Sequence, residues 1–575
     1  MVAFALTLGA SPGAGTPQSE RPDPGRARRL AKLDRGLQSV LKAQRRDHVR
    51  VIVRTNASSH AWIANDIATR GGHVGGFLTS VSGMAASVPA DQLPQLADDP
   101  AVESISTDAV VTSAGLPSSD ALFATLPRPG GGLSGAQVTV AVVDSGIEPN
   151  ADFGRRVVGF FDFTQGGIPR RPFDDYGHGT HVAGLIAGRE TGVAPGARLI
   201  GLKVLDANGS GYTSDVIRAL DFLTANHRWL GVQIVNLSLG HPILESAAND
   251  PLVQAVEAAT RAGLVVVVSA GNYGRRADTG VAGYAGITSP GNAPSAITVG
   301  SLDTQGTPDR QDDCVADYSS RGPTWYDAAA KPDIVAPGHA LTSVAATKGS
   351  LYANHPGARV AGGNGAAYMR LSGTSLATAV ASGTIALMIE ANRQLYRQPL
   401  TPNAVKAALQ WSAIGVEGAD ALTQGAGGLN AAGAVAIARA VDTTRATGSR
   451  WLVGVLPQST TIDSVPWSWG QTVVWGNAVL SGQVMTANQP AWARTVVWGN
   501  TIVWGSAVGW GTDVVWEDAS VWSSTVVWGN ALVGTTNGAT VVWGNTSVTP
   551  LTVVWGNLAM GSIAPAAHSL VGPVE

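Results

Sequence analysis

Three short stretches of the chain contain residue types that can perform nucleophilic chemistry. The run VTVAVVDSGI, which is typical of a buried strand, ends near Asp144, the run YGHGTHVAG contains His178, and LSGTSLATAVASG contains Ser375. A serine hydroxyl is a weak nucleophile at its own pKa, so it needs a base within hydrogen-bond reach and a group that orients the base. An acid, a histidine and a serine together meet that need. The sequence therefore favours a Ser-His-Asp triad that carries out acyl transfer.

Each stretch also has a plainer interpretation when it is taken alone. A cluster of Ser, Thr and Gly such as the one around Ser375 is common in loops that lead into a helix of small residues. The two histidines of HGTH, His178 and His181, could form a metal-binding pair. However, no Asp or Glu stands at the helical ligand offset that such sites use, so no metal is predicted.

The order of the three residues and their flanking sequences together indicate a family. Acid, histidine and serine follow one another as in subtilisin, and from roughly Val49 to Asp442 the chain resembles the subtilisin-like serine peptidases. The resemblance implies that Asp144 orients the imidazole of His178, which acts as the general base, while His181 has a packing role. Ser375 is then the nucleophile, at a helix start whose backbone N–H groups help to stabilise the oxyanion.

The resemblance also assigns an oxyanion donor and two walls of a substrate cleft. Asn272, the last residue of VVVVSAGN, corresponds to the side-chain donor to the oxyanion, although a turn residue after a strand is the alternative. The walls correspond to two segments against which a peptide lies as an added strand, and they consist of Ser238, Leu239, Gly240, Gly209, Ser210 and Gly211. Because such binding uses the substrate main chain, broad endopeptidase specificity is implied.

Some positions depart from the family pattern. Leu376 stands where the family usually has Met, and Ala379 stands where it usually has Pro. The connection LIAGRET, which follows HGTHVAG, is shorter than the loop that binds a strong calcium ion in well-known members. Asp152 matches one ligand of that calcium site, but its loop partners are absent, so neither calcium nor any other cofactor is predicted.

The order of apolar runs and helical patterns predicts an α/β fold for residues 121–442, the expected catalytic domain. Runs such as VTVAVV, ARLIGLKVL and GLVVVVSAGN alternate with helical segments, among them Thr213 to Leu230 and Asp250 to Ala262. Continuous apolar strands separated by helices indicate a subtilisin-like parallel sheet with helices on both faces. Ligands of such sheets lie beyond the carboxyl ends of the strands, which is where Asp144 and Asn272 fall.

Length and composition suggest several domains and exclude some partners. The chain has 575 residues, of which 45% are hydrophobic and 14% charged, as in globular proteins. A net charge of −3 gives no reason to expect nucleic acid or an anionic membrane as a partner. The single cysteine, Cys314, cannot form an internal disulfide, and no run of 18 apolar residues suggests a transmembrane segment.

The N-terminal part of the chain reads as an export and folding region. Residues 1–20 resemble the second half of a secretory signal, although the basic start of such a signal is missing. Residues 26–46 have a basic, helix-like pattern that favours a solvated face. Residues 47–112 alternate as β-α-β-β-α-β, which predicts a ferredoxin-like α+β domain similar to the inhibitor propeptides of this family. A permanent accessory domain is the alternative, and a cut is expected between about Val111 and Ala121.

The C-terminal part has a different composition and an internal repeat. A linker is expected at residues 443–465, a Trp-rich hexapeptide-repeat region at 466–557 and a tail at 558–575. Tryptophans recur every six residues from Trp498 to Trp528, in units such as TVVWGN. Val-Val is a poor helix former and Gly-Asn favours a turn, so a tight β-meander or a β-solenoid is predicted.

Two functions from different classes fit these patterns. The first is a secreted or cell-surface serine endopeptidase that hydrolyses polypeptides through an acyl-enzyme and is activated by cutting off its own inhibitory propeptide. The second is a surface or scaffold protein that binds a wall, a glycan, another partner or a second copy of itself through the Trp-rich repeats. In the second case the peptidase serves only to process the chain itself.

Overall fold

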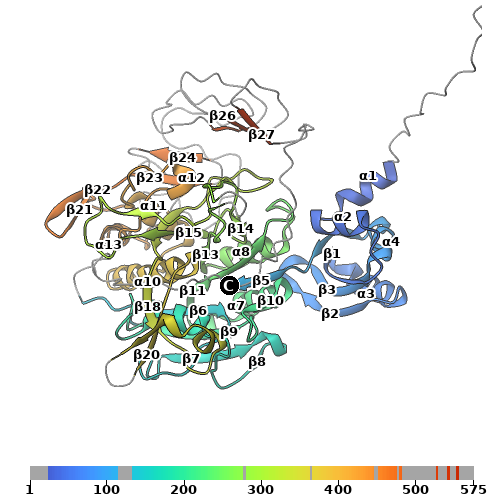
Figure 1. Cartoon of the computed structure of the whole chain (residues 1–575), viewed down its shortest axis with the longest axis horizontal. Coiled ribbons are helices and arrows are strands. Elements are labelled where there is room, and N and C mark those ends of the chain that lie inside the picture. The colour runs from blue at the N-terminus through green and yellow to red at the C-terminus, as the bar shows by residue number, and fades with distance from the viewer. Residues whose placement is uncertain are drawn as a thin grey trace, which may run out of the picture.

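The computed structural model describes most of the chain as far as residue 481. The described residues are 24–113, 132–275, 280–362, 366–445, 451–475, 478–481, 526–528, 540–543 and 552–555. An N-terminal module, residues 24–113, lies to one side of a larger central body, residues 132–475, and strand β5 (Val110–Ser113) reaches from the module into the body (Figure 1). The signal-like segment predicted at residues 1–20 and the tail predicted at 558–575 lie outside the described residues.

The N-terminal module contains a four-stranded antiparallel sheet in the order β2-β3-β1-β4. From residue 48 onward its elements follow as strand, helix, strand, strand, helix, strand, which is the order read from the sequence. Their bounds are β1 His48–Thr55, α3 His60–Thr69, β2 His73–Leu78, β3 Gly83–Pro89, α4 Leu93–Asp98 and β4 Val102–Thr107.

Two further helices precede this sheet, in the segment whose basic, helix-like pattern predicts a solvated face. Helix α1 spans Pro24–Ala31 and α2 spans Arg35–Lys42. Leu33 and Leu37 are buried in the apolar core of the module. Leu37 reaches this core from α2, whereas Arg35 and Lys42 of the same helix are exposed.

The two faces of the module sheet have different neighbours. Val51 and Val53 of β1 pack with α3 and α4 in the core of the module. Ile52, which points to the other face, is buried in the same cluster as residues of the central body, and Leu78 and Val81 lie there too. A β-strand directs successive side chains to opposite faces, so β1 serves the module core and the contact with the body at once.

The central body is built on a nine-stranded sheet in the order β16-β15-β13-β11-β6-β9-β7-β8, with β17 paired to β15. The two terminal pairs, β15 with β16 and β7 with β8, are antiparallel, and the others are parallel. The bounds are β6 Thr139–Asp144, β7 Val157–Asp162, β8 Ile168–Pro169, β9 Arg198–Lys203, β11 Val232–Leu237, β13 Val265–Ser269, β15 Ile297–Asp303, β16 Cys314–Val315 and β17 Ile334–Pro337.

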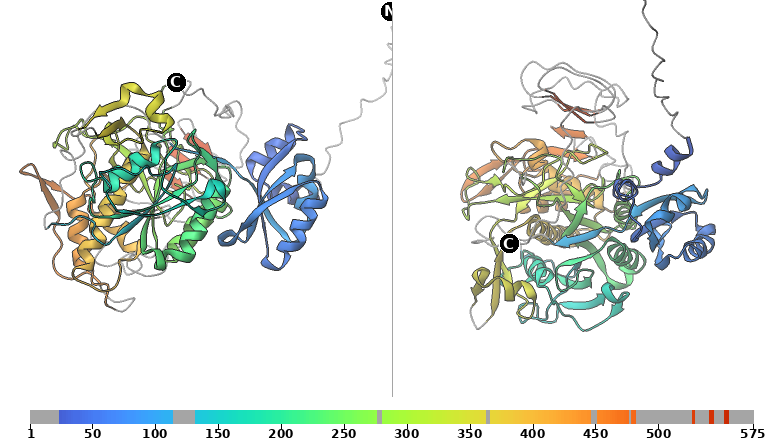
Figure 2. Two further views of the ribbon diagram at one scale, coloured as in Figure 1. Left: turned by 90° about the horizontal axis from the view of Figure 1, so that it is seen from below. Right: turned by 45° about the vertical axis from the view of Figure 1, so that its right-hand side comes forward.

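Helices cover both faces of this sheet, as the continuous apolar strands predict. Val140 and Val142 of β6 face one core, whereas Ala141 and Val143 face the other. The first core is covered by α6, α10, α11 and α13, and the second by α7 and α8 (Figure 2). The helices are α6 His178–Ala187, α7 Thr213–Leu230, α8 Pro251–Arg261, α9 Ser350–Asn354, α10 Thr374–Arg393, α11 Pro402–Trp411, α12 Ala421–Gln424 and α13 Ala431–Ala440.

Short strands complete the body around the sheet. Strands β18, β20 and β19 form a three-stranded sheet next to α6, and β10, β5, β12 and β14 form a four-stranded sheet. Their bounds are β10 Ser210–Tyr212, β12 Leu239–Pro242, β14 Thr288–Ser289, β18 Leu341–Val344, β19 Arg359–Ala361 and β20 Ala367–Leu371.

Two tryptophans in and after the predicted linker at 443–465 pack into the central body. Trp451 is 1% exposed and belongs to the core under α10 and α13, and a hairpin of β21 (Ser459–Ile462) and β22 (Val465–Ser468) follows it. Trp469, which the sequence assigned to the repeat region, is buried in the same core. The composition changes in this segment, but the packing of the central body continues to Trp469 because these tryptophans cover apolar surface that would otherwise face water.

Part of the repeat region is described as short strands. β23 (Thr472–Trp475) and β24 (Ala478–Ser481) form an antiparallel hairpin. β25 (Val526–Trp528), β26 (Thr540–Trp543) and β27 (Thr552–Trp555) are parallel, and their registers align Trp with Trp and Val with Val. The hairpin has the alternating strand direction of a meander, and the three parallel strands have the common direction of a solenoid.

One described helix, α10, has the length and apolar composition of a membrane span, and 94% of its apolar window is buried inside the protein. It occupies the centre of the body, between the sheet and α13.

Candidate active site

The acid and the histidine predicted for the triad meet at the carboxyl end of the central sheet. Asp144 is the last residue of β6, and His178 is the first residue of α6. The Nδ1 atom of His178 lies 2.9 Å from each carboxylate oxygen of Asp144. Both side chains are buried, with 0% and 1% exposure. A carboxylate in this position fixes the tautomer of the ring and stabilises an imidazolium that forms there.

The turn before α6 is held by a buried carboxylate that sequence reasoning missed. Asp174 accepts hydrogen bonds from Gly177 N (2.7 Å), from Thr180 N (2.9 Å) and from the hydroxyl of Ser145 (2.9 Å). The Ser145 hydroxyl in turn accepts from Gly179 N at 2.9 Å. Burial raises the pKa of Asp174, while these donors oppose that shift.

This network ties the end of β6 to the start of α6, and so it fixes the position of His178 relative to Asp144. The place of Ser145 directly after Asp144, and of Asp174 shortly before His178, was visible in the sequence. The hydrogen bonds that join them were not, because they depend on two segments that only the fold brings together.

The second histidine of the HGTH run has no exposed surface to offer a ligand. His181 is 1% exposed, and its Nε2 lies 3.0 Å from the carbonyl of Met369 in β20. Burial lowers the pKa of His181 to about 3, so the ring is neutral. Its contacts are those of a packing residue between α6 and β20.

Ser375 lies in the first turn of α10, which packs against α6. Its hydroxyl donates to the carbonyl of Ser238 (3.0 Å), and the hydroxyl of Ser238 donates to the carbonyl of Ser375 (2.8 Å). This reciprocal pair fixes the start of α10 against the segment predicted as one wall of the cleft. Ser375 is 0% exposed in this arrangement, which includes the N-terminal module.

Asn272 follows β13, and its orientation is set by Thr374, a residue that the sequence argument did not name. The amide oxygen of Asn272 accepts from Thr374 N (3.1 Å) and from the Thr374 hydroxyl (2.9 Å). A backbone N–H can only donate, so the atom that faces it must be the oxygen and not the nitrogen. The amide N–H₂ of Asn272 is therefore directed away from Thr374.

The two predicted walls lie on either side of a strand from the N-terminal module. β5 pairs antiparallel with β10, matching Thr112 to Ser210 and Val111 to Gly211. On its other edge β5 pairs antiparallel with β12, matching Ser113 to Leu239 and Thr112 to Gly240. The cleft is thus filled by an added strand of the same chain, held by main-chain hydrogen bonds on both edges.

Gly209 and Thr288 shape the ends of this cleft. Gly209 has φ +74°, and a Cβ there would lie 2.5 Å from the ring of Tyr176, so the turn before β10 requires glycine. Thr288 in β14 lies beside β12, on the edge away from β5. It fills the space between Gly240 and Gly271, because a Cβ on Gly240 would lie 2.7 Å from its hydroxyl and a Cβ on Gly271 would lie 2.8 Å from its methyl group.

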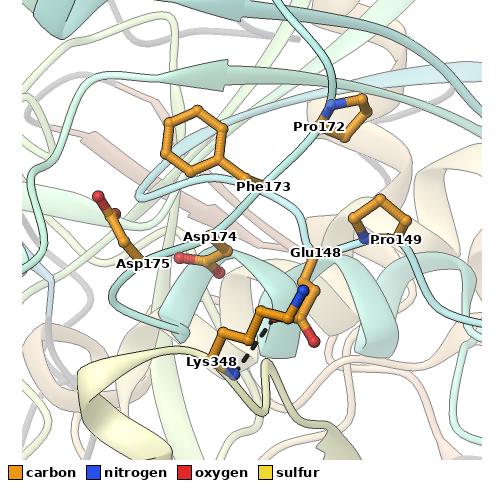
Figure 3. Close-up of a pocket in the computed structure, with 7 residues that line it drawn as sticks. All are labelled: Glu148, Pro149, Pro172, Phe173, Asp174, Asp175 and Lys348. Atoms are coloured by element: carbon orange, nitrogen blue, oxygen red, sulfur yellow. Dashed lines mark hydrogen bonds between the residues drawn. The ribbon is translucent and has the colours of Figure 1, made fainter.

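A pocket of about 190 Å³ lies beside the turn that carries Asp174 (Figure 3). The carboxylate of Glu148 accepts from Thr347 N (3.1 Å) and from Lys348 N (3.3 Å), so it joins the loop after β6 to the loop after β18. None of Asp144, His178 and Ser375 lines the pocket. It borders the candidate site without belonging to it.

The residues around Asp152 show how the short LIAGRET connection is held. The carboxylate of Asp152 accepts from Glu190 N (3.2 Å), and its carbonyl accepts from Arg189 N (3.3 Å). Among the described residues there is no group of three or more His, Cys, Asp or Glu side chains that could hold a metal ion.

Comparison with known proteins agrees with this geometry. The model of the Subtilase family matches residues 135–435. Serine protease AprX of Bacillus subtilis is 39% identical over 320 residues, covering 54% of this chain and 68% of AprX. The extracellular serine proteinase of a Thermus strain is 34% identical over 358 residues, covering 58% of this chain and 75% of that enzyme.

A solved structure supports the fold alone. Fervidolysin from Fervidobacterium pennivorans, described as a keratinolytic enzyme related to subtilisin, has a TM-score of 0.54 and 19% sequence identity. The match covers 72% of this chain and 63% of fervidolysin, which is less than two thirds of that enzyme's length.

Proposed function

The chain belongs to the subtilase family and is a subtilisin-like serine endopeptidase, and from this premise we propose that it is an exported enzyme that cuts off its own N-terminal module as an inhibitory propeptide. One observation carries the proposal. Strand β5, at the end of the module, occupies the space between β10 and β12 where a substrate would lie.

We assign the catalytic roles as follows. Ser375 Oγ attacks the carbonyl carbon of the peptide bond, and His178 takes the hydroxyl proton and later gives it to the leaving amine. Asp144 holds the imidazole and stabilises its charged form. The oxyanion of the tetrahedral intermediate accepts from the Asn272 amide and from backbone N–H at the start of α10. In the second half of the reaction, water attacks the acyl carbonyl carbon while His178 takes a proton from it. His178 then returns the proton to Ser375 Oγ, and the carboxylic acid product leaves.

The N-terminal module suits the part of an inhibitor and folding template. A ferredoxin-like propeptide is supported by the element order of the module and by its antiparallel sheet order β2-β3-β1-β4. Asp108 of the module accepts from Ser214 N (2.8 Å) and so caps the start of α7 in the body, where no residue of α7 itself provides a side-chain cap. Asp221 of α7 accepts in return from Thr79 N (2.8 Å) and Ser80 N (3.0 Å) of the module.

The strand register points to one bond for self-cleavage. Ser113 pairs with Leu239, and in an antiparallel pair one step forward in β5 is one step back in the wall. The described part of β5 ends at Ser113, and Ser238, the residue before Leu239, has the carbonyl that accepts from Ser375 Oγ. We therefore expect the bond after Ala114 to be cut.

The test compares the parent chain with its Ser375→Ala variant after expression of both. The parent should yield a shorter form whose N-terminal residue is Gly115, together with the freed module, and the variant should stay full length. Processing of the variant, or an active parent that keeps residues 48–111 covalently attached, would contradict the proposal. Export is supported by the signal-like segment and by the relative named an extracellular proteinase, and it is checked by recovery of the processed enzyme from the culture medium.

A second function is favoured by the C-terminal strands. The parallel, in-register pairing of β25, β26 and β27 builds an array that could bind a glycan, a wall or another copy of the chain at the surface. In that case the peptidase would act only on its own chain. Turnover of an unrelated peptide by the processed form separates the two functions, because a scaffold needs no such activity.

A further inference from the structure

A buried amide stands in the middle of the central sheet, shortly before one wall of the cleft. Asn236 is the fifth residue of β11, which lies between β13 and β6 (Figure 1), and it is 0% exposed. Residues two apart on a strand share a face, and Ile234 of the same strand packs in the core that α10 covers. The Asn236 side chain is therefore directed toward α10, in an interior where an amide is stable only if its polar atoms are hydrogen-bonded.

Both polar atoms of this amide are bonded to buried serines. Asn236 Oδ1 accepts from the hydroxyl of Ser382 in α10 (2.9 Å), and Asn236 Nδ2 donates to the hydroxyl oxygen of Ser238 (2.9 Å). The Ser238 hydroxyl donates to the carbonyl of Ser375 (2.8 Å), and Ser375 Oγ donates to the carbonyl of Ser238 (3.0 Å). All three serines are 0% exposed. A chain of hydrogen bonds thus connects the interior of α10 with the nucleophile through the sheet.

The direction of each bond in this chain follows from its last acceptor. A backbone carbonyl can only accept, so the single hydrogen of the Ser238 hydroxyl is used on Ser375. Ser238 Oγ must then accept from Asn236, and the atom that faces it is the amide nitrogen. The amide oxygen is left to accept from Ser382. Because the reversed amide would bring two acceptors together at Ser238, Asn236 has one favourable orientation.

The chain of hydrogen bonds holds α10 at two points. Ser375 and Ser382 are seven residues apart, which is close to two turns, so they lie on one face of the helix and about 10 Å apart along its axis. Asn236 contacts the second point directly and the first through Ser238. Two points on one face limit both sliding of the helix along the sheet and rotation about its axis. The first turn, which carries Ser375 Oγ, is thereby fixed relative to the sheet.

We propose that Asn236 is a positioning residue for the reaction. Its amide, oriented by Ser382, holds the Ser238 hydroxyl on the Ser375 carbonyl and so sets the place from which Ser375 Oγ reaches His178. Asn236 itself touches neither the substrate nor the reacting atoms. This role rests on the proposed function of Ser375 as the nucleophile, and it adds the interior residues that keep the nucleophile in place.

Loss of this support should affect turnover more than substrate binding. The wall that contains Leu239 and Gly240 is held on the edge away from β5 by β14, where His241 pairs with Ser289. This pairing does not involve Asn236, so the wall should keep its shape when Asn236 is replaced. The start of α10, in contrast, loses a fixed point, and displacement of reacting groups by about 1 Å can cost about 10²-fold in rate.

The experiment measures kcat and KM of the processed enzyme on one peptide substrate. Active sites are counted by organophosphonate labelling to completion, so that unfolded protein does not contribute. Asn236→Ala should lower kcat by about tenfold to 10²-fold, while KM stays within about twofold of the parent. Ser382→Ala, which allows the amide to turn, should lower kcat by about threefold to tenfold, the range of one hydrogen bond. The double variant should be no slower than Asn236→Ala, because Ser382 acts only through Asn236.

Two variants of matched burial serve as controls. Asn392→Ala removes a buried amide from the far end of α10, where it donates to the carbonyls of Ala438 and Val441 (2.7 Å each). Ser412→Ala removes a buried hydroxyl that donates to the carbonyl of Ala408 in α11 (2.8 Å). Both should lower Tm of the organophosphonate-inhibited enzyme and leave kcat at the parental value, since neither side chain is bonded to the first turn of α10.

Parental kcat in Asn236→Ala or in Ser382→Ala would overturn this role of Asn236. Losses of kcat that the controls reproduce, or losses that multiply in the double variant, would overturn it as well. Ser382→Ala decides the question if Asn236→Ala does not fold, because alanine is the best helix former and only one hydroxyl is removed. Failure of the proposed function would be seen separately, as activity that survives Ser375→Ala.

Discussion

At the scale of single residues, the candidate site is a set of side chains that cannot work alone. His178 has its ring held by Asp144, Asn272 has its amide turned by Thr374, and Ser375 sits where α10 begins. Each of these contacts fixes the orientation of a side chain, so that this conformational freedom is not lost during the reaction. Catalysis then depends on the unit and not on the sum of its members.

The first prediction concerns this unit. Replacing any one of Ser375, His178 and Asp144 by Ala should abolish nearly all hydrolysis of a peptide substrate, measured as kcat/KM of the processed enzyme. Asn272→Ala should retain activity at about 10² to 10³ below the parent, a range established for the same donor in subtilisin itself. Parental activity in Ser375→Ala, or labelling of another residue by an organophosphonate, would show that the assignment is wrong.

The second prediction concerns the residue on the amino side of the cleaved bond. Thr288 fills the space between Gly240 and Gly271, and its hydroxyl donates weakly to the carbonyl of Ala270 (3.4 Å). A small residue should therefore be preferred there, as Ala114 would be. Thr288→Gly should raise kcat/KM for Leu or Phe at this position relative to Ala by about tenfold, since each added buried methylene contributes about 0.8 kcal/mol. An unchanged ratio would show that Thr288 does not limit the site.

At the scale of elements, the site depends on where helices begin. α6 begins at His178 and α10 begins one residue before Ser375, and the two helices pack on the same face of the sheet. Gly179 shows how tight this junction is, because a Cβ there would lie 2.2 Å from the carbonyl of Gly146. The helix can approach β6 only with glycine at that position.

The third prediction concerns a buried pair of lysines that joins β17 to α11. Lys331 and Lys406 both bond to Asp333, at 2.7 and 2.9 Å, and all three are 1% exposed. Burial lowers the pKa of Lys331 to about 7, which Asp333 opposes and Lys406 reinforces. The unfolded chain then binds more protons than the folded one between about pH 7 and pH 10, so this lysine makes stability rise with pH.

Lys331→Met should remove that contribution while it leaves Lys406 paired with Asp333. In the Ser375→Ala background, Tm of the variant relative to the parent should be highest at about pH 7 and should fall by a few degrees by about pH 10. Lys348→Met, at an exposed position, is the matched control and should show no such trend. A difference in Tm that is constant across this range would contradict the prediction.

At the scale of the whole molecule, the three parts of the chain are joined to different degrees. The N-terminal module contributes a strand to the cleft, a cap to α7 and an apolar sheet face to one core of the body. The segment after residue 450 contributes Trp451 and Trp469 to the other core. The packed central body therefore extends to Trp469, beyond the region 135–435 that matches the family.

The fourth prediction tests that boundary. A chain that stops after Ser481 keeps Trp469 and should hydrolyse peptides nearly as the full chain does, whereas one that stops after Val465 loses it and should be unstable. Trp469→Ala should cost about 3 to 5 kcal/mol of stability, because a buried ring is replaced by a cavity. Trp467→Ala, two residues earlier and only half-buried, should cost much less. Equal losses, measured by thermal unfolding in the Ser375→Ala background, would show that Trp469 is not part of the core.

The sequence by itself determined the chemistry and the main sheet. The acid, histidine and serine are recognisable because each lies in a run whose glycines and small residues are required by close contacts, as at Gly179. The apolar strands are recognisable because both of their faces are buried, which leaves no polar alternation. The order of strands and helices in the N-terminal module follows from local periodicity in the same way.

Only the tertiary structure decided which distant groups meet. Asp174 and Ser145, Thr374 and Asn272, and β5 with its two walls are pairs whose members are far apart in the chain or carry no local signal. The same holds for Trp469. The sequence around it resembles the repeats, but its side chain is buried in the core of the central body. The periodicity of a sequence indicates which face of an element a residue occupies, but packing of the whole chain decides which residue it contacts there. The residues that hold the triad in place and the contacts of the N-terminal module could therefore not be predicted from the sequence.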